Sequence, residues 1–142
     1  MIFIPEIFMF LGFLVFLIIS VFLKKNSHII VGYLSLLLIF LTQFFVLKDI
    51  FLFEEIFNSF FVIDSFGSFL KSIILISAGL VIYFYLIVKN EISLQRPEFL
   101  LITLIAIIGM MLMVSSNDLL SLFVSLELQS LALYILVSFS KD

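Results

Sequence analysis

Residues Leu119–Val137 read LLSLFVSLELQSLALYILV, a run of 19 residues in which only Glu127 carries a charge. An α-helix needs about 20 mostly apolar residues to cross the hydrocarbon core of a bilayer, which is roughly 30 Å thick. The length and composition of this run match that requirement. The stretch therefore predicts a transmembrane helix, and it decides the fold class of the chain.

Four further apolar runs precede this one, at about 7–23, 29–47, 69–88 and 99–114. The whole chain of 142 residues is 65% hydrophobic and 12% charged, whereas a soluble domain has about 25% charged residues. Five spans leave little room for anything else. We predict an all-α integral membrane protein with about five transmembrane helices, forming one domain over residues 1–142 without a soluble catalytic domain.

Several kinds of site are excluded by composition. The chain has no cysteine, so it cannot build a disulfide, an iron–sulfur cluster or a cysteine-based zinc site by itself. Its single histidine, His28, follows Lys24 and Lys25 and fits an ordinary interfacial residue better than a lone metal or haem ligand. A net charge of −3 without a basic cluster disfavours nucleic acid as a partner. We expect no cofactor or metal to be bound by this chain.

Two segments between the apolar runs are polar. Residues 48–66 mix acidic side chains with many Phe and Ile, which predicts an interfacial loop; an interfacial helix, a hairpin and an irregular cover all fit it. The tight turn Ser115–Asp118 precedes the fifth span, where Asn117 and Asp118 can cap the helix by accepting hydrogen bonds from its free N–H groups.

The distribution of basic residues predicts the orientation. One side of a five-span chain carries five of them and the other side two, Lys48 and Lys71. Loops rich in basic residues stay on the inner side of a membrane. The side with five basic residues therefore faces the matrix or cytoplasm, and the N-terminus faces the opposite side. The five basic residues are Lys24, Lys25, Lys89, Arg96 and Lys141.

Glu127 is the residue that requires an explanation, because it lies next to the midpoint of its span. A charged carboxylate there costs roughly 2.5–3.5 kcal/mol on insertion scales, so it should face protein or water. Ser130, Tyr134 and Ser138 follow at helical spacing and form a polar stripe with it. Hydroxyl groups can donate to a carboxylate and pass protons, which favours a proton-relay carboxylate.

A simpler interpretation is a neutral glutamic acid that ties helices together by hydrogen bonds. The sequence offers Glu127 no cation, because none of the seven basic residues is predicted within the membrane core. A partner cation must therefore come from another chain, or it does not exist.

Residues Pro97–Tyr134, PEFLLITLIAIIGMMLMVSSNDLLSLFVSLELQSLALY, resemble the fourth and fifth helices of the antiporter-like subunits of respiratory complex I. Within that family Leu126–Leu131 is most similar to the NADH-ubiquinone oxidoreductase chain 2 branch. The resemblance implies a membrane subunit in which Glu127 couples to a lysine on a later helix during proton translocation. It also implies that NADH, FMN, iron–sulfur clusters and ubiquinone are bound by other subunits.

The resemblance covers only the N-terminal part of such a subunit, because the chain ends where a sixth helix should begin. We expect either a fragment or a subunit encoded by a split gene, with a separate polypeptide carrying the rest. The polar ending Lys141–Asp142 favours the second expectation.

The amino-acid usage of the chain indicates which genome encodes it and in which membrane it lies. Twenty Phe beside three Ala and one Arg favour an AT-rich genome, and an organelle genome fits better than a general preference of membrane proteins for Phe. We therefore expect the mitochondrial inner membrane, with the N-terminus toward the intermembrane space.

A structural or assembly subunit without a proton-relay role is the alternative function. An independent carrier or channel is disfavoured, since no inverted repeat or broken helix is visible.

Overall fold

The computed structural model describes residues 4–22, 27–48, 54–56, 61–87 and 97–139. Five α-helices lie within these ranges, and all five are long and apolar enough to cross a membrane. The prediction of an all-α chain with about five spans is confirmed. The helices are α1 (Ile4–Phe22), α2 (Ser27–Lys48), α3 (Ser65–Ile87), α4 (Pro97–Ser115) and α5 (Leu119–Phe139).

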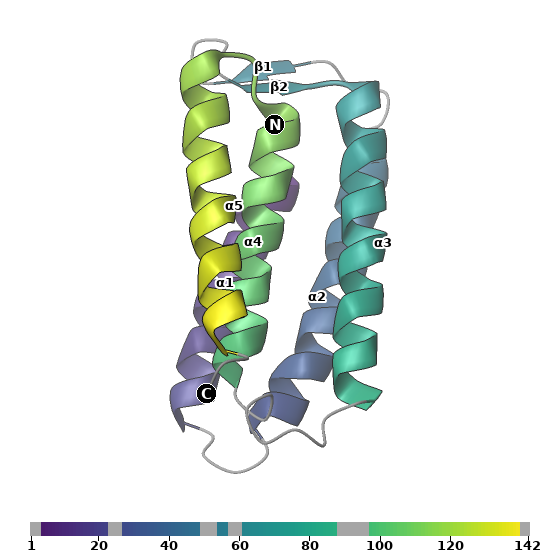
Figure 1. Ribbon diagram of the computed structural model, residues 1–142. Helices are drawn as coiled ribbons and strands as arrows, with labels where there is room; N and C mark the ends of the chain where they lie inside the picture. The colour runs from purple at the N-terminus through teal and green to yellow at the C-terminus, as the bar shows by residue number, and fades with distance from the viewer. Residues whose placement is uncertain (1–3, 23–26, 49–53, 57–60, 88–96, 140–142) are drawn as a thin grey trace.

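Successive helices run in opposite directions, as they must if each crosses the same membrane (Figure 1). The starts of α1, α3 and α5 therefore lie at one end of the bundle, together with the ends of α2 and α4. The same end carries a small β-hairpin, and we call it the hairpin end (Figure 1).

The core lies among the first four helices. Helix α4 packs against α1, α2 and α3, and α2 packs against both α1 and α3, whereas α5 packs on α4. Large apolar side chains fill the space between α1, α2, α3 and α4. The fully buried ones include Met9, Val31, Leu75, Leu100, Leu104 and Met111. Helix α5 is thus an outer helix of this part of the chain, with one packed face.

Strands β1 (Glu54–Ile56) and β2 (Phe61–Ile63) pair antiparallel, with Glu54 opposite Ile63 and Ile56 opposite Phe61. Phe61 also forms a β-bridge with Ser116 in the turn between α4 and α5. Of the three alternatives for residues 48–66, the described part forms a hairpin, which lies over the end of α4. Residues 49–53 and 57–60 lie outside the described ranges.

Helix α3 begins at Ser65, four residues before the predicted start at Phe69. The reason is local. The carboxylate of Asp64 accepts a hydrogen bond from the Gly67 N–H at 2.7 Å, and the Asp64 carbonyl accepts one from the Ser68 N–H at 3.0 Å. Asp64 thus caps the helix and satisfies donors that the first turn leaves free. The earlier start moves Lys71 from the helix end to a position six residues inside α3.

The start of α5 agrees with the polar turn that precedes it. The Asp118 carbonyl accepts hydrogen bonds from the Leu122 N–H and from the Ser121 hydroxyl, both at 3.0 Å. The Ser121 hydroxyl in turn accepts one from the Asp118 N–H at 3.3 Å. The backbone of Asp118 and the hydroxyl of Ser121 therefore make the hydrogen bonds at this helix start, and capping by the Asn117 and Asp118 side chains stays a prediction.

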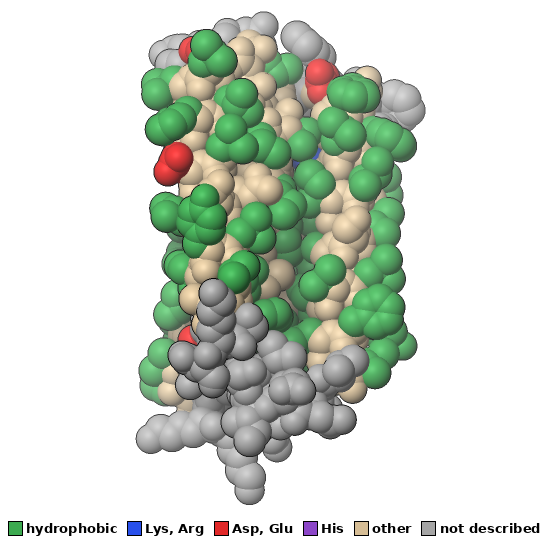
Figure 2. Space-filling view, in the orientation of Figure 1, with side chains coloured by type: hydrophobic (Ala, Val, Ile, Leu, Met, Phe, Trp, Pro, Cys, Tyr) green, Lys and Arg blue, Asp and Glu red, His purple; other side chains and the backbone are tan. Residues whose placement is uncertain are grey.

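The outer surface of the bundle is apolar over most of the visible face (Figure 2). Phe22, Phe40, Phe66 and Leu119 each expose more than two thirds of their surface. Soluble monomers rarely expose contiguous apolar patches above a few hundred Å². The surface is suited to lipid. The basic residues at 24, 25, 89, 96 and 141, the His28 side chain and the chain end at 141–142 lie outside the described parts, so the predicted orientation stays a prediction.

Candidate functional site

Glu127 lies in α5, eight residues after Leu119, which places it about 12 Å along the helix axis from the hairpin end. Its side chain is exposed. Figure 2 shows an acidic side chain interrupting the apolar outer surface of α5. Within the part of the chain that the structure describes, no basic side chain forms an ion pair with Glu127. The carboxylate therefore points away from the packed core.

The packing of α5 on α4 explains this direction. Ser121, Ser125 and Ala132 are the buried residues of α5, and they line the face toward α4. Two residues along a helix correspond to a rotation of about 200°, so Glu127 lies nearly opposite Ser125. A methyl group on Gly109 of α4 would lie 3.0 Å from the Gln129 nitrogen and 3.2 Å from its Cα. The backbones of α4 and α5 therefore approach closely at Gly109, on the side of α5 away from Glu127.

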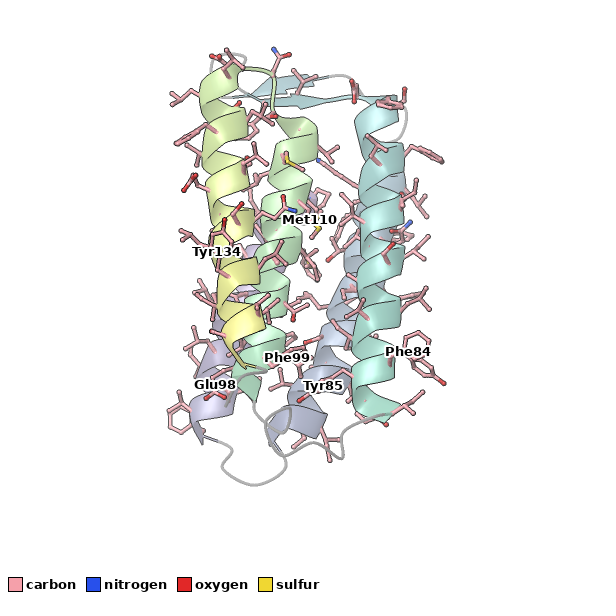
Figure 3. The ribbon with its side chains drawn as sticks, in the orientation of Figure 1. Phe84, Tyr85, Glu98, Phe99, Met110 and Tyr134 are labelled. Atoms are coloured by element: carbon pink, nitrogen blue, oxygen red, sulfur yellow. The ribbon has the colours of Figure 1, made fainter. Side chains whose placement is uncertain are left out.

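The rest of the predicted polar stripe shares the outward direction in part. Tyr134 is 70% exposed and points away from the bundle (Figure 3), and Ser138 is exposed as well. Ser130 is half-buried. The Ser138 hydroxyl donates to the Ile135 carbonyl of its own helix at 2.7 Å, so its proton is engaged locally. Glu127, with Ser130 and Tyr134 beside it, remains the ionisable group on this face.

A second ionisable site was missed by the sequence analysis. Lys71 of α3 and Glu6 of α1 form a salt bridge inside the bundle, and they are only 3% and 4% exposed. The prediction that no basic residue lies in the membrane core is therefore wrong. The error came from placing the start of α3 at Phe69, because the cap at Asp64 carries Lys71 into the helix. The sequence Asp64-Ser65-Phe66-Gly67 held that signal.

The Glu6–Lys71 pair lies between helices that both pack on α2 and α4. Lys71 is about 9 Å from the start of α3, whereas Glu6 is about 3 Å from the described start of α1. The pair therefore lies in the interior formed by α1, α2, α3 and α4, near the hairpin end. Both Glu6 carboxylate oxygens are buried, and Oε1 contacts the Lys71 ammonium group.

An apolar groove of about 400 Å³ opens between α3, α4 and α5. It is lined mainly by small and branched side chains, with Phe99 toward one end and Met110 toward the other, as their labels in Figure 3 show. Tyr85 stacks on Phe99 with ring centroids 5.2 Å apart and closes the space between α3 and α4 at that end. The groove contains no ionisable side chain.

Comparison with known proteins gives a consistent result. No protein-family model matches the chain. The chain is 36% identical over 140 residues to the NADH-quinone oxidoreductase subunit N of Paramagnetospirillum magneticum, which covers 97% of the chain and 28% of that relative. It is 37% identical over 145 residues to the protein of the same name from Bartonella bacilliformis, with 97% and 28% covered. For the Rhodobacter capsulatus protein of that name the identity is 41% over 89 residues, 63% of the chain and 19% of the relative. The chain spans less than a third of the length of these relatives.

Proposed function

We propose that this chain, whose curated relatives are NADH-quinone oxidoreductase subunit N, the antiporter-like subunit of complex I, contributes Glu127 to proton translocation coupled to quinone reduction. The predicted resemblance to antiporter-like subunits is confirmed by these relatives. They are subunits of an enzyme complex, so the natural partners of this chain are other complex I subunits. The redox groups belong, in this proposal, to those other subunits.

The observation that carries the proposal is the outward direction of Glu127 near the middle of α5. In lipid an ionised carboxylate at that depth costs roughly 2.5–3.5 kcal/mol, so a protein element or water must cover it. The relatives are more than three times as long as this chain. We infer that helices corresponding to the rest of such a subunit, whether on a separate polypeptide or not, pack on this face of α5.

Those helices would also supply the cation that Glu127 lacks among the described residues. A carboxylate between a cation and hydroxyl groups such as those of Ser130 and Tyr134 can exchange a proton when the cation moves, because the charged form is stabilised only while the cation is near. This is the chemistry required of a relay site. The helix-tying alternative uses the same position but requires no change of charge.

The test replaces Glu127 with Gln, which keeps the size and removes the charge, in the assembled complex in native membranes. We expect a normal amount of complex and normal NADH oxidation by an artificial acceptor, but fewer protons moved per NADH oxidised with quinone. Glu98→Gln is the matched control, because Glu98 is an exposed glutamate at the far end of α4.

Two results would decide against the relay. Unchanged proton movement in Glu127→Gln leaves the carboxylate without a role in translocation. Loss of the assembled complex in this variant, but not in Glu98→Gln, supports the structural alternative instead.

The location in the mitochondrial inner membrane is proposed on residue usage alone. The relatives named above are bacterial, and together with the five spans they support a membrane location. Sequencing organelle DNA from the source and finding the coding region there tests the finer proposal. A nuclear or bacterial chromosomal gene would overturn the organelle origin.

A further inference from the structure

The Glu6–Lys71 pair is the strongest feature that the proposed role of Glu127 does not use. A buried ion pair costs several kcal/mol of desolvation per ion, and replacing such a pair with apolar side chains is often neutral or stabilising. Stability alone is therefore a weak reason for its presence. In a membrane span, paired ionisable groups by default mark a path for ions or protons.

The geometry is that of two proton-binding groups in direct contact. The Lys71 ammonium group contacts Oε1 of Glu6, and both carboxylate oxygens are buried. A carboxylate oxygen accepts hydrogen bonds or takes up a proton. The Glu6 carboxylate is thus a proton acceptor next to a group that can deliver a proton.

The position of the pair along the bundle is off-centre. Lys71 lies about 9 Å along α3 from its start, and Glu6 lies about 3 Å from the described start of α1. Both helices start at the hairpin end, so the pair is nearer to the hairpin end than to the opposite end of the bundle.

The other charged side chains that the structure describes near the hairpin end lie at helix ends. Helices α2 and α4 pack against α1 and α3, and their described ionisable side chains near the hairpin end reduce to Lys48, which is exposed and lies over the Phe44 ring. Asp64 caps α3, and Asp118 stands at the start of α5. These groups lie at helix ends, whereas Glu6 and Lys71 are buried among α1, α2, α3 and α4.

We propose that Glu6 and Lys71 form a proton-transfer pair that passes protons to the hairpin end of the bundle. In the step, Lys71 loses one proton from its ammonium group and Glu6 takes it up, which turns ammonium and carboxylate into amine and carboxylic acid. The total charge of the pair stays zero. The acid then releases its proton to water at the hairpin end, and the amine takes up a proton from the interior, which restores the ion pair.

This proposal deepens the proposed proton translocation by placing a second transfer site in the chain, and it rests on that function. By the predicted orientation the hairpin end faces the outer side of the membrane, so the pair would act where protons leave. The described residues supply no cation for Glu127, whereas the pair has both members within the described chain.

The first experiment uses the assembled complex carrying Glu6→Met together with Lys71→Met. Because the double substitution removes both charges and keeps apolar volume, we expect the complex to assemble. We expect the number of protons moved per NADH oxidised to fall, with NADH oxidation by an artificial acceptor unchanged. Glu98→Met is the matched control, since Glu98 also follows a proline at a helix start but is exposed.

The second measurement reads the carboxyl group directly. Infrared difference spectra of the complex with and without turnover should contain a carboxylic acid C=O band that shifts in D₂O, and Glu6→Gln, which retains Lys71, should lose it. The band is independent of Glu127, so its loss in Glu6→Gln and its persistence in Glu127→Gln support the pair even if Glu127 proves silent.

The outcomes separate the alternatives. If the double Met variant assembles and moves protons like the parent complex, the pair is a structural lock and the proposal is overturned. If the double variant fails to assemble, the infrared test decides: a spectrum of assembled Glu6→Gln identical to that of the parent also overturns it.

Discussion

Two glutamates in the membrane-spanning helices meet opposite environments. Glu6 is buried between α1 and α3 beside Lys71, while Glu127 faces outward from α5 without an ion-pair partner in the described chain. The sequence singled out Glu127 at mid-span and did not single out Glu6, which stands at a helix start. The difference teaches that depth along a helix and burial within a bundle are separate properties.

The two parts of the chain also differ in whether their charged side chains have partners among the described residues. The part formed by α1, α2, α3 and α4 pairs its own buried charges, whereas α5 presents a charge that requires another element. A helix bundle that pairs its buried charges internally is complete in this respect, and one that exposes a carboxylate to lipid is not.

Removing one member of the buried pair should have the largest effect. Lys71→Met leaves the Glu6 carboxylate buried and unpaired, which costs about 3–5 kcal/mol in known cases. We expect a marked fall in the unfolding midpoint of the chain in detergent micelles, followed by circular dichroism. Lys48→Met is the control, because Lys48 is exposed and contacts only the Phe44 ring among the interactions described. Equal midpoints for the two variants would contradict the distinction between interior and surface charges.

Replacing Glu127 in the chain by itself should be favourable, whereas replacing Lys71 should be destabilising. Glu127→Leu removes a charge that costs roughly 2.5–3.5 kcal/mol at the centre of an inserted helix, so α5 should insert more readily. A glycosylation-site assay of membrane insertion measures this. Glu6→Leu is the matched variant, and it should lower stability since it strands the Lys71 ammonium group. If both substitutions shift stability in the same direction, the two glutamates do not differ as described.

The close approach of α4 and α5 should control which way Glu127 faces. Gly109→Ala places a methyl group 3.0 Å from the Gln129 nitrogen, and overpacking of this kind costs about 1–3 kcal/mol. Gly79→Ala is the control, because its methyl group would meet only Ile39 at 3.9 Å.

The readout for this pair is a spin label on α5. The chain has no cysteine, so Leu131→Cys, at an exposed position, can be labelled selectively. We expect Gly109→Ala to change the mobility of the label and Gly79→Ala to leave it unchanged. The same mobility in both backgrounds would mean that the Gly109 contact does not set the rotation of α5.

The cap of α3 should have a smaller effect. Asp64→Ala removes the acceptor of the Gly67 N–H and should cost about 1 kcal/mol, as loss of an N-cap usually does. The first turn of α3 should then exchange its amide hydrogens faster, while Lys71, one turn further on, stays in the bundle. Hydrogen exchange followed by mass spectrometry checks this. Protection of Ser65–Ser68 equal to that of the parent chain would show that the cap is dispensable.

The smallest effect is expected at Glu98. It opens α4 after Pro97, just as Glu6 follows Pro5 in α1, yet its side chain is exposed (Figure 3). Exposed substitutions usually change stability by less than about 0.5 kcal/mol. Glu98→Gln should therefore leave the unfolding midpoint of the chain unchanged. A fall comparable to that of Lys71→Met would mean that a proline-glutamate helix start is itself a stabilising unit, whatever its burial.

The fold was largely predictable from the sequence because a lipid environment permits few backbone structures. A run such as Leu119–Val137 must form a spanning helix, since its backbone hydrogen bonds have no other partners in lipid. The number of helices and their alternating direction follow from such runs. The start of α3 was not predicted correctly. The apolar content of a segment indicates which residues lie in the membrane, whereas the first residue of the helix depends on hydrogen bonds of a polar residue, here Asp64.

The candidate sites were predictable only in part. The sequence by itself identified Glu127 as a charge in mid-span and assigned the chain to a class of membrane proteins. The tertiary structure was needed to show that Glu127 faces outward, that α4 and α5 approach closely at Gly109, and that Glu6 and Lys71 meet although they are 65 residues apart in the sequence. The physical reason is that local periodicity determines which residues share one helix face. The packing of different helices determines what each face meets.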